Sequence, residues 1–224
     1  MIPAIIDDYP DSLKSVLINS VYFEARWGGE WSYDENDKDT FTLLDGSVKE
    51  LALIHNKASG YFENDKATAF RYPYRKGMEF IGILPKETGD FTIESLDISS
   101  LLESETYDFD VYARMPKLKF ETSLPLSEAL SAAGLSEVFD PDKADLSGIA
   151  DELYVTDILQ KTALELDEYG TRAAAVTEFL FGYAMPMPRE KKEKKYVYLD
   201  RPFAFLIYDA EQDQIVFIGK VTEP

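Results

Sequence analysis

One stretch of this chain combines the features of a loop with those of a buried strand, and it constrains the fold more than any other. Residues 167–179 read DEYGTRAAAVTEF, and a run of alanines flanked by charges favours a helix. At period two, however, one parity holds both Arg172 and Glu178, whereas the other is uncharged. The uncharged parity comprises Thr171, Ala173, Ala175, Thr177, Phe179 and Phe181. Because the surroundings are typical of an exposed loop, we expect a segment that exists in two states.

Strand patterns dominate the rest of the chain. Residues 13–27 begin as a nearly continuous apolar run, which is typical of a strand buried on both faces. Residues 41–54 predict two strands around an Asp45-Gly46 turn. Further strands are expected at 78–87, ending at Pro85, at 107–124, interrupted by Pro116, at 153–170, and as a pair at 201–221.

A single short helix is expected at 124–139, where Ser127 is a plausible cap and Gly134 lies near the end. No repeat or linker divides the chain. The pattern therefore predicts one domain with one or two large, mostly antiparallel sheets and few helices.

The charge balance limits the possible partners. The 224 residues include 23 Lys and Arg against 42 Asp and Glu, which gives a formal net charge of -19. A phosphate backbone would be repelled, so no nucleic-acid partner is expected, and the basic cluster at 188–196 is interpreted as a solvated loop. A hydrophobic content of 45% fits a globular domain with a sizeable core, and no membrane partner is expected.

The sequence has few of the residues that a catalytic or metal site requires. The chain has no cysteine and one histidine, His55, which has no nucleophile motif beside it and is interpreted as a satisfied polar residue near a strand end. Asp34 and Asn36 are spaced like the start of a calcium loop, but the turn glycine and the distal ligands are missing. No metal, cofactor or enzymatic activity is expected, and the sequence favours a binding or interaction protein.

Six stretches, in order from about residue 13 to 224, resemble the serpin family of serine protease inhibitors. They are LINSVYFEARW, PKLKFETSLPLSEALSAAGLSEVF, ADLSGI, LYVTDILQKTALELDEYGTRAAA, DRPFAFLI and FIGKV. The resemblance implies an α+β serpin fold of mostly antiparallel sheets with few helices and an exposed reactive loop. Residues 1–224 would form the C-terminal part of a single serpin domain.

The resemblance also implies a suicide substrate, in which a serine protease cleaves the loop and the loop then inserts into the central sheet. It implies hinge residues at Glu168, Gly170, Thr171, Ala173, Ala174 and Ala175. Counting from the hinge glutamate as in the family places the scissile bond at Ala184–Met185, with Arg189 as a competing site. A small apolar residue at this bond suits elastase-like or subtilisin-like proteases.

Three further residues match positions at which the family controls sheet opening. They are Asn19, Trp27 and Gln160; Gln160 stands where the family has a histidine, and Trp27 fits a core aromatic equally well. The family's N-terminal portion has no counterpart, so we expect another polypeptide to complete the fold, at an extracellular site. A non-inhibitory serpin-like binding protein and an inactive or self-assembling fragment remain as alternatives.

Overall fold

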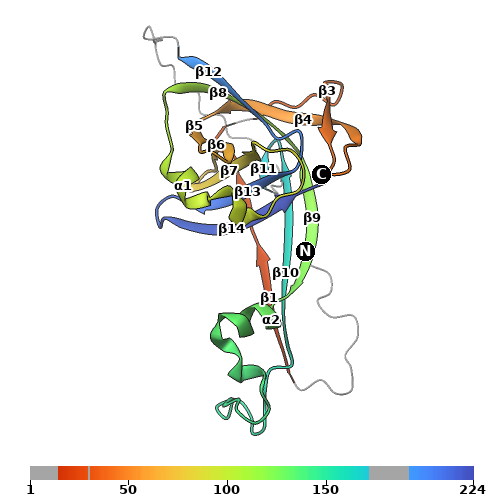
Figure 1. The fold of residues 1–224 in the computed structure, drawn as a ribbon, viewed down its shortest axis with the longest axis vertical. Coiled ribbons are helices and arrows are strands. Elements are labelled where there is room, and N and C mark those ends of the chain that lie inside the picture. Colours follow the sequence, from red (N-terminus) through yellow and green to blue (C-terminus); the bar gives the residue numbers. More distant parts are fainter. Residues whose placement is uncertain (1–14, 30, 172–191) are drawn as a thin grey trace. The chain divides into compact units, whose positions relative to one another are not determined.

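The computed structural model describes residues 15–29, 31–171 and 192–224. The chain divides into two compact units (Figure 1). The first comprises residues 1–23 and 119–165, and the second comprises residues 24–118 and 166–224. Each unit is described by itself.

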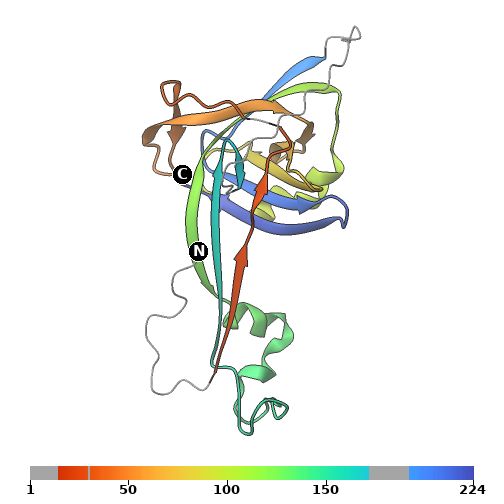
Figure 2. The same cartoon turned by 180° about the vertical axis from the view of Figure 1, so that it is seen from behind.

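Long strands form the first unit. β1 (Val16–Tyr22) lies parallel to β10 (Asp157–Asp167), and seven residue pairs join them. β9 (Leu118–Pro125) pairs with β10 as well, and the two strands run side by side in both views (Figures 1 and 2). β10 therefore has a hydrogen-bonded neighbour on each edge, and β1 confirms that residues 13–27 contain a strand. The expected burial of this strand on both faces is wrong, because β1 lies at the edge of the sheet among the described strands and exposes Leu17 and Ile18.

A series of short helical turns replaces the single helix expected at 124–139. They are α2 (Ser127–Leu130), the π-helical turn η2 (Ser131–Leu135) and the 3-10 turn η3 (Glu137–Phe139).

The predicted cap is wrong, because Ser127 is the first helical residue and follows Leu126 at the N-cap position. Its hydroxyl instead donates to Asp157 Oδ1 at 2.5 Å and accepts from the Ile158 amide at 2.9 Å. This side chain thus ties the start of the helix to the start of β10.

Two sheets form most of the second unit. The larger is antiparallel throughout, in the order β14-β13-β7-β6-β5. Its strands are β5 (Gly60–Glu63), β6 (Ala67–Pro73), β7 (Met78–Pro85), β13 (Phe203–Asp209) and β14 (Gln214–Val221). The strands expected at 78–87 and 201–221 are confirmed, whereas β5 and β6 were not predicted.

The smaller sheet has the order β12-β8-β4-β3. Its strands are β3 (Lys38–Thr42), β4 (Val48–Ala58), β8 (Phe109–Pro116) and β12 (Glu193–Tyr198). β3 and β4 confirm the expected hairpin, and Gly46 in its turn has a φ of 82°. The loop interpretation of 188–196 is wrong from Glu193 onward, because β12 is an edge strand, where lysines are well tolerated.

One hydrophobic core cluster of the second unit lies against one face of the larger sheet. A 3-10 turn η1 (Ile93–Leu96) and helix α1 (Ile98–Glu103) bury Leu96 and Leu101 on this face beside Phe62 and Ile81. With the sheet that contains β10, the described part of the chain has three sheets rather than one or two. It confirms the predicted β-rich fold with few helices. Over the described ranges, no helix combines the length and apolar composition that a membrane crossing requires.

Candidate functional site

The candidate site is the turn that follows β10. Here the chain reverses into β11 (Gly170–Thr171), which is antiparallel to the end of β10 and, on its other edge, to β2 (Ala25–Arg26). Thr171 lies opposite Leu166 on one side and Ala25 on the other. The first residues of the predicted hinge strand are therefore held inside a sheet and flanked by two strands.

Asp167 and Gly170 explain why the chain turns at this point. The Asp167 carboxylate accepts hydrogen bonds from the amides of Tyr169 at 2.8 Å and Gly170 at 3.2 Å, a local pattern that stabilises a tight turn. Gly170 has a φ of 143°, and a Cβ atom there would lie 2.3 Å from the Ala25 carbonyl oxygen. Only glycine fits this close approach of two strands without displacing one of them.

Trp27 contacts this turn directly. Its indole Nε1 donates to the Asp167 carbonyl oxygen at 2.8 Å, and its amide donates to the Tyr169 carbonyl oxygen at 3.2 Å. The buried ring stacks on Tyr74 with centroids 4.2 Å apart and planes 8° from parallel. Trp27 is thus a core aromatic, as one interpretation of this residue expected, and it also contacts the turn before Gly170.

Glu168 forms an ion pair beside the turn. Its carboxylate lies 2.8 Å from Lys117 Nζ, and this ammonium group also lies 3.3 Å from the centre of the Tyr33 ring. The Glu168 side chain is 16% exposed, so the pair is better shielded from water than a surface ion pair.

A buried pair of hydroxyl groups completes the site. Thr171 is fully buried, and its Oγ1 lies 2.8 Å from the hydroxyl of Tyr74. Burial raises the pKa of Tyr74, so this phenol stays protonated and available as a hydrogen-bond donor.

Asn19 and Gln160, two of the predicted sheet-opening residues, lie opposite each other in the first unit. They form the middle pair of the parallel β1 and β10 ladder. Separating β1 from β10 therefore requires separating these two residues.

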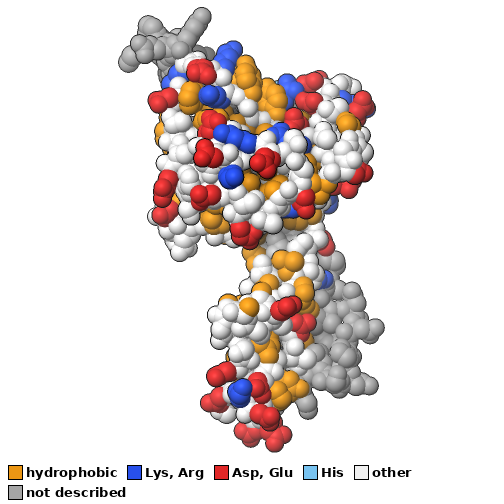
Figure 3. All heavy atoms as spheres, viewed as in Figure 1, with side chains coloured by type: hydrophobic (Ala, Val, Ile, Leu, Met, Phe, Trp, Pro, Cys, Tyr) orange, Lys and Arg blue, Asp and Glu red, His pale blue; other side chains and the backbone are white. Residues whose placement is uncertain are grey.

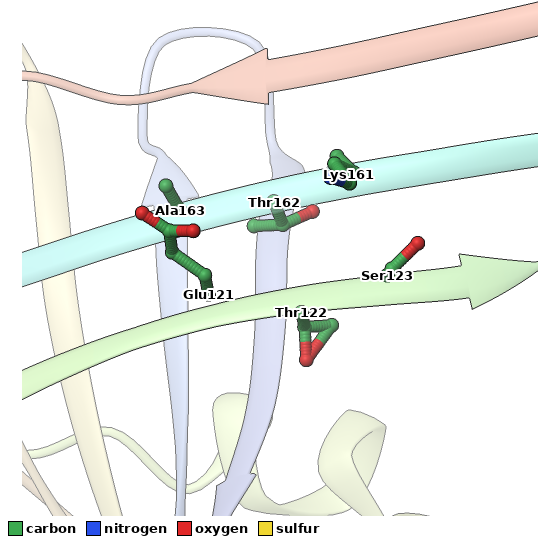
Figure 4. Close-up of a pocket in the computed structure, with 6 residues that line it drawn as sticks. All are labelled: Glu121, Thr122, Ser123, Lys161, Thr162 and Ala163. Carbon is green, nitrogen blue, oxygen red and sulfur yellow. The ribbon is translucent and has the colours of Figure 1, made fainter. Parts of the chain in front are cut away.

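β10 is also occupied on its other edge. Glu121, Thr122 and Ser123 of β9 and Lys161, Thr162 and Ala163 of β10 line a shallow hollow of about 230 Å³ (Figure 4). Both strands line the hollow because β9 is the hydrogen-bonded neighbour of β10. A strand added to β10 in this unit would have to displace either β1 or β9.

The structure thus brings Glu168, Gly170 and Thr171 together with Trp27, and Asn19 together with Gln160. The other predicted residues, Ala173, Ala174, Ala175, Ala184 and Met185, lie outside the described residues.

No local pattern in the sequence predicts Lys117, Tyr33 or Tyr74 at this site. Lys117 and Tyr74 are separated from Glu168 and Thr171 by many tens of residues, and Tyr33 contacts Lys117 rather than the turn itself. Only the placement of Lys117 just after the Pro116 strand break gave a signal that it lies where a strand ends.

Comparisons with known proteins identify the fold and the family. The family model described as Serpin (serine protease inhibitor) matches residues 1–224. Leukocyte elastase inhibitor A of Mus musculus is 30% identical over 227 residues, which cover 94% of this chain and 59% of the mouse protein. An uncharacterized serpin-like protein of Thermococcus kodakarensis is 32% identical over 220 residues, which cover 94% of this chain and 50% of that protein.

Among solved structures, the native state of the thermophilic serpin tengpin aligns with a TM-score of 0.79 at 30% identity. The alignment covers 98% of this chain and 58% of tengpin. This chain accordingly spans little more than half of the length of the relatives that it matches. Because the family match extends over the whole sequence, the chain belongs to the serpin (serine protease inhibitor) family.

Proposed function

We propose that this chain is the loop-bearing part of a serine protease inhibitor that acts as a suicide substrate. The observation that carries the proposal is β11, which lies between β10 and β2 and is antiparallel to both. A strand that already has both neighbours can grow into the sheet by adding residues at its free end, which is the form of strand addition that trapping requires.

Growth of β11 beyond Thr171 has a defined path in this proposal. The next residues of the loop would enter between β1 and β10, where the seven parallel pairs now lie. The alternating sequence supports this path, because one parity from Thr171 to Phe181 is uncharged and suits the buried face of a sheet. Asn19 and Gln160 would then control opening, since the inserted strand has to part them.

The target is proposed to be an elastase-like or subtilisin-like serine protease, acting outside the cell. Support comes from Ala184, a small apolar residue at the expected scissile bond, and from a mouse relative named as a leukocyte elastase inhibitor. Small residues fit the shallow specificity pocket of such proteases, whereas a trypsin-like pocket selects Arg or Lys.

A second polypeptide with the N-terminal elements of a serpin domain is proposed to cover apolar side chains in each unit. In the first unit, Leu17 and Ile18 of β1 are 58% and 38% exposed. In the second, Ile215, Val216 and Ile218 of β14 are each more than 40% exposed. Hydrophobic side chains are visible between the charged ones on the surface of both units (Figure 3). A partner that buried these side chains would remove apolar surface from water, which favours association.

The test of the proposed function is complex formation with proteases. The chain, completed by the second polypeptide proposed above, is mixed with an elastase-like and with a trypsin-like serine protease, and the products are analysed by denaturing gels and mass spectrometry. We expect a denaturant-resistant covalent complex with the elastase-like enzyme and cleavage after Ala184. Cleavage without a complex would instead indicate a non-inhibitory binding protein, and concentration-dependent oligomers in size-exclusion chromatography would indicate a self-assembling species.

Two neighbouring substitutions separate insertion from cleavage. Ala173→Arg places a charge on the parity that faces the core after insertion, whereas Ala174→Arg places the same charge on the opposite parity. We expect both variants to be cleaved, but only Ala174→Arg to retain the covalent complex. Equal complex formation by the two variants would contradict insertion along the proposed path.

A further inference from the structure

We propose that Tyr74 is a positioning residue for the hinge, whose hydroxyl holds Thr171 in the sheet before any protease arrives. The effect on inhibition rests on the proposed function, whereas the holding contact itself does not. Among the described residues, Thr171 is the polar side chain buried most completely, with no exposed surface. A buried hydroxyl needs a hydrogen-bond partner, and the hydroxyl of Tyr74 supplies one at 2.8 Å.

The position of Tyr74 is fixed from several directions. Its ring stacks on Trp27 at 4.2 Å, its amide donates to the Met78 carbonyl oxygen at 2.8 Å, and a β-bridge links it to Trp27. Trp27 in turn donates to the Asp167 carbonyl oxygen at the opposite end of the turn. Trp27 therefore contacts the chain before the turn, at Asp167, and Tyr74 contacts it after the turn, at Thr171.

In the proposed inhibitor, this arrangement affects whether the acyl-enzyme is trapped by insertion or is hydrolysed. With Thr171 already paired to Leu166 and Ala25, insertion after cleavage starts from an existing strand end rather than from a free loop. Loss of the Tyr74 hydroxyl would let the hinge leave the sheet more often. Insertion would then compete less well with hydrolysis of the acyl-enzyme, and more inhibitor molecules would be consumed for each protease trapped.

Amide hydrogen exchange tests the holding contact without any protease. Tyr74→Phe keeps the ring and its stacking but removes the hydroxyl, and Thr171→Val removes the other hydroxyl at nearly constant volume. We expect each variant to speed amide exchange across residues 166–171 by about three- to tenfold, as for the loss of one net hydrogen bond. The double variant should exchange no faster than the singles, because both changes remove the same interaction.

Tyr72→Phe is the matched control. Tyr72 also packs against Trp27, with ring centroids 5.5 Å apart, but its hydroxyl accepts a hydrogen bond from Asn56 Nδ2. This variant should leave exchange across the hinge unchanged. Unchanged amide exchange across residues 166–171 in Tyr74→Phe would overturn the holding contact. A double variant in which the rate increases of Tyr74→Phe and Thr171→Val multiply would overturn it as well.

The stoichiometry of inhibition then tests the functional part. We expect the number of inhibitor molecules consumed per trapped protease to rise about twofold or more in Tyr74→Phe, with Tyr72→Phe matching the unmodified protein. Faster hinge exchange with an unchanged stoichiometry would refute the positioning role. If the unmodified protein traps no protease, the proposed function fails, while the exchange experiment still decides the holding contact.

Discussion

Replacing Gly170 with alanine should release the hinge strand from β2. The residue has a φ of 143°, which side chains with a Cβ atom rarely adopt, and forcing a non-glycine residue into a disfavoured backbone region costs on the order of 1–3 kcal/mol. The added Cβ would also lie 2.3 Å from the Ala25 carbonyl oxygen and 2.7 Å from Arg26 Cα.

The steric clash of the added Cβ differs from the conformational cost, because the atoms that it meets belong to the backbone of β2. Backbone atoms cannot rotate away as a flexible side chain can, so β11 has to move away from β2. That movement weakens the pairs that join Gly170 to Arg26 and Thr171 to Ala25. Each backbone hydrogen bond lost costs about 0.5–1.5 kcal/mol, so Gly170→Ala should cost roughly 2–4 kcal/mol in total.

Gly89→Ala isolates the conformational part of this cost. Gly89 has a φ of 111°, but a Cβ atom at this position would meet nothing within 4 Å. Urea unfolding of both variants should show Gly170→Ala as the more destabilised by at least about 1 kcal/mol, and hydrogen exchange should rise across 166–171 in this variant alone. Equal losses of stability in Gly170→Ala and Gly89→Ala would show that the close approach of β11 and β2 adds no cost. Unchanged hydrogen exchange across 166–171 in Gly170→Ala would show the same.

Three further predictions concern Trp27, the expected scissile bond, and the partly buried carboxylate of Glu79, which lies 3.2 Å from Arg71 Nε. Trp27→Phe should lower the free energy of unfolding by about 0.5–1.5 kcal/mol more than Trp31→Phe, because only the Trp27 indole has a hydrogen-bond partner among the described residues; urea unfolding compares them. Burial raises the pKa of Glu79, so the folded state keeps its proton longer, and stability relative to Glu79→Gln should fall as the pH rises above 4.5; a constant difference in urea titrations across pH would contradict this. Ala184→Arg should move covalent complex formation from elastase-like to trypsin-like proteases on denaturing gels, and an unchanged preference would place the scissile bond elsewhere.

The strands that alternate or run apolar could be predicted because burial leaves a local trace in the sequence. The buried strands β7 and β13 were predicted this way, whereas the hairpin of β3 and β4 was predicted from its Asp45-Gly46 turn. β12 was missed because its composition is that of a solvated segment; a strand at the edge of a sheet can carry lysines without breaking any ladder. Ser127 was misassigned because its hydroxyl bonds to Asp157, thirty residues later in the sequence.

The sequence predicted the buried face of the candidate site but not the residues that contact it. Parity predicted that Thr171 faces the core, and its complete burial agrees with that prediction for this residue. The partners of the hinge could not be predicted, because Lys117, Tyr74 and Ala25 reach it through tertiary contacts. Local periodicity reports which face is buried, but not what covers it.

The parallel ladder between β1 and β10 sets the kinetics of the proposed insertion. Each residue pair that separates gives up one parallel rung, and an inserted strand would replace it with two antiparallel rungs, one to each neighbour. After the first pair has separated, each further step would therefore lower the free energy. The activation barrier of the insertion would then lie at Tyr22 and Ala163, the pair nearest the hinge. Substitutions from that pair as far as Asn19 and Gln160 should change the rate of trapping, and those deeper in the ladder mainly the stability of the trapped state.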